Sequence, residues 1–143
     1  MIYTQATKKA IRLMFDRHME QTDKSGLPYV FHPFHVAEQM TDENTTVCAL
    51  LHDILEDTDT TAEELLEMGF KAEVVEAIQL LTHGDGVSYT DYIAAIKANP
   101  TARAVKLADL AHNSDITRLP DNPDQRDLDR IERYKRAISF LNE

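Results

Sequence analysis

The sequence predicts an all-α protein of about seven or eight helices, and three observations support this fold class. Apolar residues recur at helical spacing through most of the chain. Only four glycines and five prolines occur among the 143 residues, too few for a turn-rich β architecture. No segment has the alternating pattern of a strand, and no repeat or linker divides the chain. We therefore expect one compact helical bundle over residues 1–143.

The helices follow in order from the periodicity and the breaks between its segments. A loop rich in Gly, Pro and Ser over residues 22–29 separates the first two helices. Gly69 is placed to end a short helix, and residues 119–123 break the chain before the last one. The expected segments are about 4–19, 31–40, 45–58, 62–68, 74–81, 88–98, 100–113 and 125–141.

Several helix starts carry their own signals. Pro33 suits a first turn, where a missing N–H group has no helical partner to lose, and Pro100 opens a helix for the same reason. Thr45 or Thr46 is expected to cap the central helix. The run Thr61-Ala62-Glu63-Glu64 fits a capping box.

The overall charge and composition exclude several functional classes. A net charge of −10 argues against a nucleic acid polymer or an anionic membrane as the partner. No run approaches the roughly 20 apolar residues that span a bilayer. The first residues lack the basic-then-apolar pattern of a signal peptide, and the single Cys48 lies in an apolar run, as a buried hydrophobe would. We expect a cytoplasmic protein.

The central helix carries an unusual set of polar residues. His52-Asp53 and Glu56-Asp57 interrupt an otherwise apolar face, and on one helix His52 would lie over Glu56 and Asp53 over Asp57. Buried carboxylates without compensation are costly, so a divalent cation would explain them. The alternative is an exposed acidic face at the helix end, although acids there oppose the helix dipole.

A second polar cluster lies on the Ala- and Leu-rich helix that begins at Pro100. Asp109 is a charge in an apolar setting, with His112 and Asn113 one turn beyond it. The alternative role for Asp109 is a simple ion pair with Lys106. His32 stands at a loop-to-helix junction that can direct a side chain into a cleft, although a lone histidine is more often structural.

Two other histidines, His18 and His35, are expected to be structural, and the role of His83 in its Gly-rich loop stays open.

These residues resemble the H…HD…D signature of the HD superfamily of metal-dependent phosphohydrolases. The motifs Lys24-Ser25-Gly26-x-Pro28-Tyr29-x-x-His32-Pro33, His52-Asp53-x-x-Glu56-Asp57-Thr58 and Lys106-Leu107-Ala108-Asp109-x-x-His112-Asn113 are similar to the alarmone hydrolase domain of RelA/SpoT proteins. That resemblance implies a compact HD-domain helical bundle that hydrolyses ppGpp at its 3′ position, usually with Mn²⁺. The 143 residues leave no room for the further domains of the long proteins, so we expect a free-standing hydrolase domain.

The resemblance also implies a role for each matching residue. One divalent ion is expected, with Mn²⁺ first and Fe, Ni, Co and Zn as alternatives. Its implied ligands are His32, His52, Asp53 and Asp109. The implied catalytic residues are Glu56 and Asp57, which would move protons to or from water or the leaving group. The implied substrate-binding residues are Lys24, Ser25, Asn113 and Lys106.

Four features depart from the family pattern. Asp23 occupies the place of an Arg that stacks on guanine in the family. A carboxylate cannot stack on guanine in that way, and it does not attract phosphate. Leu110-Ala111 replaces the usual Arg-Leu, and His83 stands near a family Lys. The segment between Asp57 and Asp109 is also shorter than usual. Recognition of guanine is therefore where the resemblance is weakest.

The expected function is a phosphohydrolase acting on a phosphorylated small molecule, with ppGpp as the first substrate. The alternatives are a different nucleotide or phosphorylated metabolite, or a non-catalytic module that senses a nucleotide. A structural metal protein is disfavoured, since the chain lacks a closed Cys/His ligand set. The apolar face of the last helix closes the core or meets another subunit, so the oligomeric state stays open.

Overall fold

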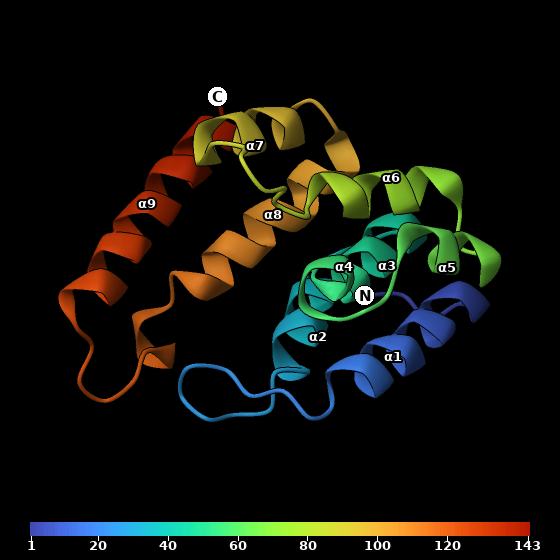
Figure 1. The fold of residues 1–143 in the computed structure, drawn as a ribbon, viewed down its shortest axis with the longest axis horizontal. Helices are drawn as coiled ribbons and strands as arrows, with labels where there is room; N and C mark the ends of the chain where they lie inside the picture. Colours follow the sequence, from blue (N-terminus) through green and yellow to red (C-terminus); the bar gives the residue numbers. More distant parts are fainter.

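The protein is all-helical in a computed structural model that describes residues 1–143 (Figure 1). This confirms the predicted fold class. The only β pairing is an isolated bridge between Thr22 and Pro28. The helices are α1 (Gln5–His18), α2 (Phe31–Glu38), α3 (Glu43–Leu51), α4 (Ile54–Asp57), α5 (Ala62–Glu67), α6 (Ala72–Leu80), α7 (Tyr89–Lys97), α8 (Pro100–Asn113), the 3-10 turn η1 (Ile116–Arg118) and α9 (Gln125–Leu141).

The expected central helix is two helices, α3 and α4, which meet at His52-Asp53. The prediction of one continuous helix was wrong for a local reason. The ring Nδ1 of His52 lies 2.6 Å from the carbonyl oxygen of Ala49, and the His52 backbone N–H turns to the same oxygen. Asp53 has a backbone ψ of 3°, outside the helical range. The helix therefore ends at the two residues that the sequence singles out as functional.

Two expected caps also differ in detail. The cap of α3 is Asp42, whose carboxylate accepts from the Thr45 N–H group, in place of Thr45 or Thr46. Thr61 does accept from the Glu64 N–H group, but the Glu64 carboxylate binds Arg17 and leaves the capping box half formed. Ionic attraction to Arg17 replaces the reciprocal cap bond.

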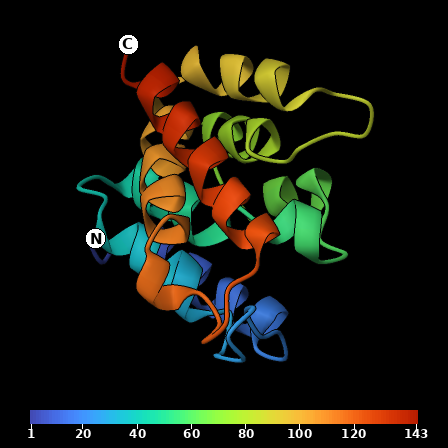
Figure 2. The ribbon, with the colours of Figure 1, turned by 90° about the vertical axis from the view of Figure 1, so that its left-hand side faces the viewer.

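Helix α3 lies at the centre of the fold and packs against α1, α2, α6 and α8. Its residues 46–51 are all buried, within one core of 28 buried hydrophobic residues. Helix α8 packs on α2 and α3 on one side and on α9 on the other, and α9 crosses over it in Figure 2. The functional motifs on α2, α3–α4 and α8 are thereby brought side by side.

Two loops meet at one end of the molecule, below α2 and α8 in Figure 1. They are the loop between α1 and α2 and the segment between α8 and α9. The Ser25 hydroxyl donates to the Arg118 carbonyl oxygen at 2.7 Å and joins them. Gly26 has φ +81° at the tip of the first loop, where a side chain would be strained. No helix combines the length and the apolar character needed to cross a membrane.

Candidate metal centre

The centre of the candidate site is His52, which is only 1% exposed. A carbonyl oxygen can only accept, so the contact with Ala49 places the proton of the neutral ring on Nδ1. The other nitrogen, Nε2, lies 3.2 Å from Asp53 Oδ2 and 3.5 Å from Asp109 Oδ1. Neither contact has the geometry of a hydrogen bond, so this buried nitrogen has no hydrogen-bond partner. When the ring is neutral, the lone pair of this nitrogen faces the two carboxylates.

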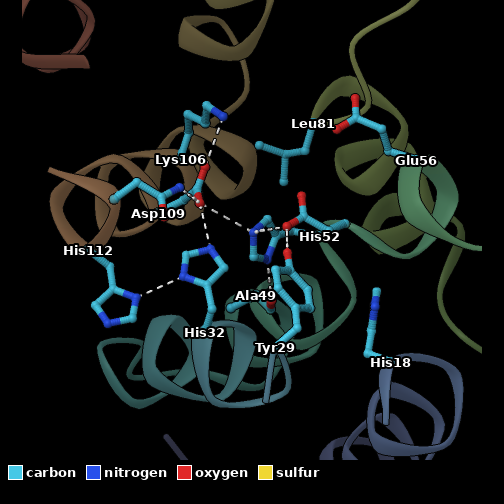
Figure 3. Close-up of polar contacts among 12 residues, drawn as sticks. His18, Tyr29, His32, Ala49, His52, Glu56, Leu81, Lys106, Asp109 and His112 are labelled. Atoms are coloured by element: carbon cyan, nitrogen blue, oxygen red, sulfur yellow. Dashed lines mark hydrogen bonds and ion pairs between the residues drawn. The ribbon is translucent and has the colours of Figure 1, made fainter. Parts of the chain in front are cut away.

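His32 and Asp109 complete the cluster from α2 and α8 (Figure 3). His32 Nε2 lies 2.9 Å from Asp109 Oδ1, and both residues are 4% exposed. One ligand atom from each of His32, His52 and Asp109 lies within 4.8 Å of the others. Two imidazole nitrogens and a carboxylate oxygen suit a first-row divalent cation, and such an ion would also satisfy the unpartnered nitrogen of His52. The residues therefore fit the expected metal.

Asp53 lies at the edge of this cluster. Its Oδ2 approaches His52 and also accepts a hydrogen bond from the Tyr29 hydroxyl. Asp53 is not one of the three residues whose ligand atoms are mutually close. Tyr29 packs its ring between His18 and His32, with centroids 5.2 and 5.7 Å away. Tyr29 thus holds the Asp53 carboxylate beside the cluster.

Electrostatics keep the cluster ionised. Burial alone would raise the pKa of Asp109, but Lys106 at 2.9 Å, with the two histidines, holds that pKa well below 3.8. Burial alone would lower the pKa of His52, but the Asp53 and Asp109 carboxylates outweigh it and raise that pKa well above 6.5. Asp109 is therefore an ionised carboxylate whose counter-charges are Lys106 and a protonated His52, and a cation bound there would replace the His52 proton.

A cavity of about 620 Å³ opens from the cluster toward the two joined loops. His32, Asp53 and Asp57 line its inner end. The other lining residues include three cations, Lys24, Arg118 and Arg130, and two further acids, Asp23 and Asp115. A pocket that offers three cationic side chains beside a candidate metal site suits a ligand that carries phosphate.

The two predicted catalytic acids are placed differently. Asp57 lines the cavity, and burial, with Asp53 and Glu56 nearby, raises its pKa to about 6. Glu56 stands apart from the cluster in Figure 3, and its Oε1 accepts from the His83 N–H group at 2.9 Å. His83 itself is held by the Val87 carbonyl oxygen and by stacking on Tyr92. Only Asp57 therefore reaches the pocket.

The four predicted substrate-binding residues also separate. Lys24 and Asn113 line the cavity, and Asn113 also donates to Asp109. Lys106 is largely buried and is paired with Asp109, so it neutralises a carboxylate of the cluster. Ser25 is engaged with Arg118 and joins the loops.

Sequence reasoning missed several residues that surround the cavity. Arg118 and Arg130 line it from η1 and α9, and neither belongs to a motif. Arg118 Nη2 lies 3.8 Å from Asp23 Oδ2, so the acid that departs from the family pattern faces a guanidinium. Tyr134 of α9 also lines the cavity. These contacts join distant segments, and no local spacing could indicate them.

An all-helical bundle with a buried two-histidine, one-carboxylate cluster belongs to the class of helical metal-binding domains. Comparison with known families identifies which one. Residues 10–113 match the HD domain family, and the chain belongs to that family. This confirms the resemblance seen in the motifs.

Curated relatives are named for alarmone metabolism. The MESH1 guanosine-3′,5′-bis(diphosphate) 3′-pyrophosphohydrolase of Danio rerio is 34% identical over 130 residues, covering 82% of this chain and 71% of that protein. The pyrophosphohydrolase of Aquifex aeolicus is 32% identical over 123 residues, covering 78% of this chain. The bifunctional (p)ppGpp synthase/hydrolase SpoT of Escherichia coli is 32% identical over 120 residues, covering 74% of this chain. The chain spans only 18% and 17% of the length of these last two proteins.

One solved structure matches almost the whole fold. It is a metazoan ortholog of SpoT, described as hydrolysing ppGpp, with a TM-score of 0.80. The match covers 99% of this chain and 87% of that one at 23% identity. The arrangement of helices around the cluster is therefore the fold of that structure.

Proposed function

We propose that the protein is a metal-dependent phosphohydrolase that releases pyrophosphate from the 3′ position of ppGpp. The observation that carries this proposal is the buried cluster of His32, His52 and Asp109, because His32 also lines a cavity that contains three cationic side chains. The names of the relatives, which include a 3′-pyrophosphohydrolase aligned over most of its length, supply the substrate.

The chain's own residues divide the reaction between them. We assign His32, His52 and Asp109 as metal ligands, with Asp53 as a fourth. The bound ion supplies Lewis-acid polarisation of the phosphoryl group and makes water more acidic. Asp57 exchanges a proton near neutral pH, because its pKa lies near 6. Water attacks the α-phosphorus of the 3′ diphosphate, and the bond from that phosphorus to the ribose 3′ oxygen breaks. The water gives up one proton and the 3′ oxygen takes one up, so the products are pyrophosphate and GDP.

Three cationic side chains that line the cavity hold the substrate. Lys24, Arg118 and Arg130 surround the outer part of the cavity, where charge-assisted hydrogen bonds to phosphate oxygens are strong. Asn113 reaches the same space from α8. The Asp23 carboxylate accepts from the Ser25 and Leu27 N–H groups and lies beside Arg118. This arrangement favours a second candidate, a phosphorylated nucleotide other than ppGpp.

The test is to incubate Mn²⁺-loaded protein with ppGpp and with a panel of nucleotides and sugar phosphates. We expect pyrophosphate and GDP from ppGpp in equal amounts. If phosphate or pyrophosphate is released only from another compound, the protein is still a hydrolase but its substrate is not ppGpp. If the protein binds Mn²⁺ but releases no phosphate or pyrophosphate from any compound, the result would contradict hydrolysis and favour a module that senses a nucleotide.

We further propose that Glu56 acts by holding the His83 loop. Glu56→Gln keeps an oxygen that can accept from the His83 N–H group, so we expect kcat to fall less than about tenfold and Mn²⁺ affinity to stay unchanged. Glu56→Ala removes the acceptor and should cost more. Steady-state kinetics with Glu63→Gln, an exposed acid on α5, as the control would test this. A drop of about 100-fold for the glutamine variant would instead assign Glu56 a direct role in proton transfer.

The remaining assignments are proposals of the same kind. We propose Mn²⁺ as the native ion, with Fe, Ni, Co and Zn to be compared in the same assay. One continuous core supports a single domain over residues 1–143. A cytoplasmic location stays a prediction from the composition.

A further inference from the structure

The two histidines of the cluster are oriented by different kinds of partner. His52 is held through Nδ1 by a backbone carbonyl oxygen, which no substitution of a side chain can remove. His32 is held through Nδ1 by another side chain, since His112 Nδ1 lies 2.8 Å away (Figure 3). His112 can donate or accept at that atom, so it decides where the proton of His32 lies.

Only one proton fits between these two nitrogens. A carboxylate can only accept, so the 2.9 Å contact with Asp109 Oδ1 is made by His32 Nε2–H. A cation bound at Nε2 would displace that proton, and a neutral His32 would then carry its one proton on Nδ1. If His112 instead carries the proton between the two nitrogens, a neutral His32 has its proton on Nε2, and no lone pair faces the cluster. Metal binding through His32 Nε2 therefore requires His112 to be the acceptor.

The structure holds the His112 ring in place for this contact. The rings of His112 and His32 are parallel to within 3°. On its other side, His112 stacks on His35 with centroids 3.9 Å apart. Arg118 Nη1 donates to the His112 carbonyl oxygen at 2.9 Å and fixes the end of α8. His35 of α2 thus supports the ring, and Arg118 of η1 fixes the backbone of His112.

We propose that His112 is a positioning residue that accepts the hydrogen bond of His32 Nδ1–H and thereby directs His32 Nε2 toward the metal. This inference rests on the metal site of the proposed function. Groups that orient a metal-binding histidine in this way typically affect metal affinity 10–100-fold.

The test compares two replacements of His112 by their Mn²⁺ affinity, measured from free Mn²⁺ by electron paramagnetic resonance. His112→Phe keeps a ring to stack on His35 but has no acceptor, and we expect affinity to fall about 10–100-fold. His112→Asn places an amide oxygen near the position of Nδ1, and we expect it to restore most of the affinity. His35→Leu removes the stacking partner but leaves the acceptor in place, so we expect a smaller loss of affinity than in His112→Phe. Thermal unfolding of each metal-free variant separates loss of the ligand geometry from loss of the fold.

The affinities of these variants decide whether His112 positions His32 for the metal. Wild-type affinity in the phenylalanine variant, or equal losses in the phenylalanine and asparagine variants, would overturn the proposal. If the phenylalanine variant does not fold, His112→Leu removes the acceptor with less bulk and carries the same expectation. Failure of the wild-type protein to bind Mn²⁺ would overturn the metal site itself, which is a different result from wild-type binding that His112 does not influence.

Discussion

We expect Asp109→Asn to abolish Mn²⁺ binding and to reduce hydrolysis of the substrate to background. Asp109 is the one carboxylate whose oxygen lies close to both His32 and His52, so its replacement removes a ligand and the charge of the centre. It also leaves the Lys106 ammonium, only 13% exposed, without its counter-charge. Breaking a buried ion pair from one side costs about 3–5 kcal/mol, so the variant should also unfold at lower temperature. Mn²⁺ titration and thermal unfolding measure the two effects.

A double replacement separates these two effects. In Lys106→Met/Asp109→Asn the unpaired ammonium is gone, so stability should return while Mn²⁺ binding does not. Asp85→Asn, which makes the same chemical change in an exposed loop, is the control for both measurements. Recovery of Mn²⁺ binding in the stable double variant would remove Asp109 from the ligand set.

The helices could be predicted from the sequence because their signals are local. Apolar periodicity, Pro100 and Gly69 each act within one or two turns, and the segments they indicate are present in the structure. The break inside the expected central helix could not be predicted in this way. Leu50, Leu51 and Ile54 continue one apolar pattern, and only the contact of the His52 ring with a carbonyl oxygen interrupts it.

The candidate site could be predicted only in part. Family motifs supplied His32, His52 and Asp109, but the distances that make them a cluster depend on how α2, α3 and α8 pack. The pair Glu56-Asp57 shows a limit of motif reading. Adjacent residues on a helix point about 100° apart, so one faces the cavity and the other the His83 loop.

The departures from the family pattern gain a physical meaning in the structure. Within its own motif, Asp23 replaces the positively charged Arg of the family. In the fold it lies beside Arg118, so a guanidinium still lines the cavity and comes from the opposite loop. Ion pairs between segments 95 residues apart leave no periodic signal. The wall of the cavity therefore had to be read from the structure.

Replacing Asp57 with asparagine should lower kcat about 100-fold or more while leaving Mn²⁺ affinity nearly unchanged. Asp57 lines the cavity but lies outside the tight cluster, and general acid–base groups typically contribute 10²–10⁴-fold. Steady-state kinetics and Mn²⁺ titration measure the two quantities. Asp59→Asn, an exposed neighbour that does not line the cavity, is the matched control. Loss of Mn²⁺ affinity in the Asp57 variant alone would make Asp57 a ligand.

The same substitution should change how stability depends on pH in the metal-free protein. The pKa of Asp57 rises from 3.8 to about 6 in the fold, so the folded state binds more protons than the unfolded state between these values. The destabilisation of the fold by the ionised Asp57 carboxylate is thus absent below about pH 4 and complete above about pH 6. This rise in pKa corresponds to roughly 3 kcal/mol, which solvent screening of an exposed side chain reduces to about 1 kcal/mol.

We therefore expect Asp57→Asn to match the wild-type free energy of unfolding near pH 4 and to exceed it by about 1 kcal/mol at pH 7. Urea unfolding at both pH values, with Asp59→Asn beside it, tests the difference. A variant less stable than wild type at pH 7 would mean that the Asp57 carboxylate is favourably bound in the fold, as a structural residue would be. Lower kcat together with higher stability is the signature of a carboxylate kept at a cost for catalysis, because packing alone gives no reason to retain it.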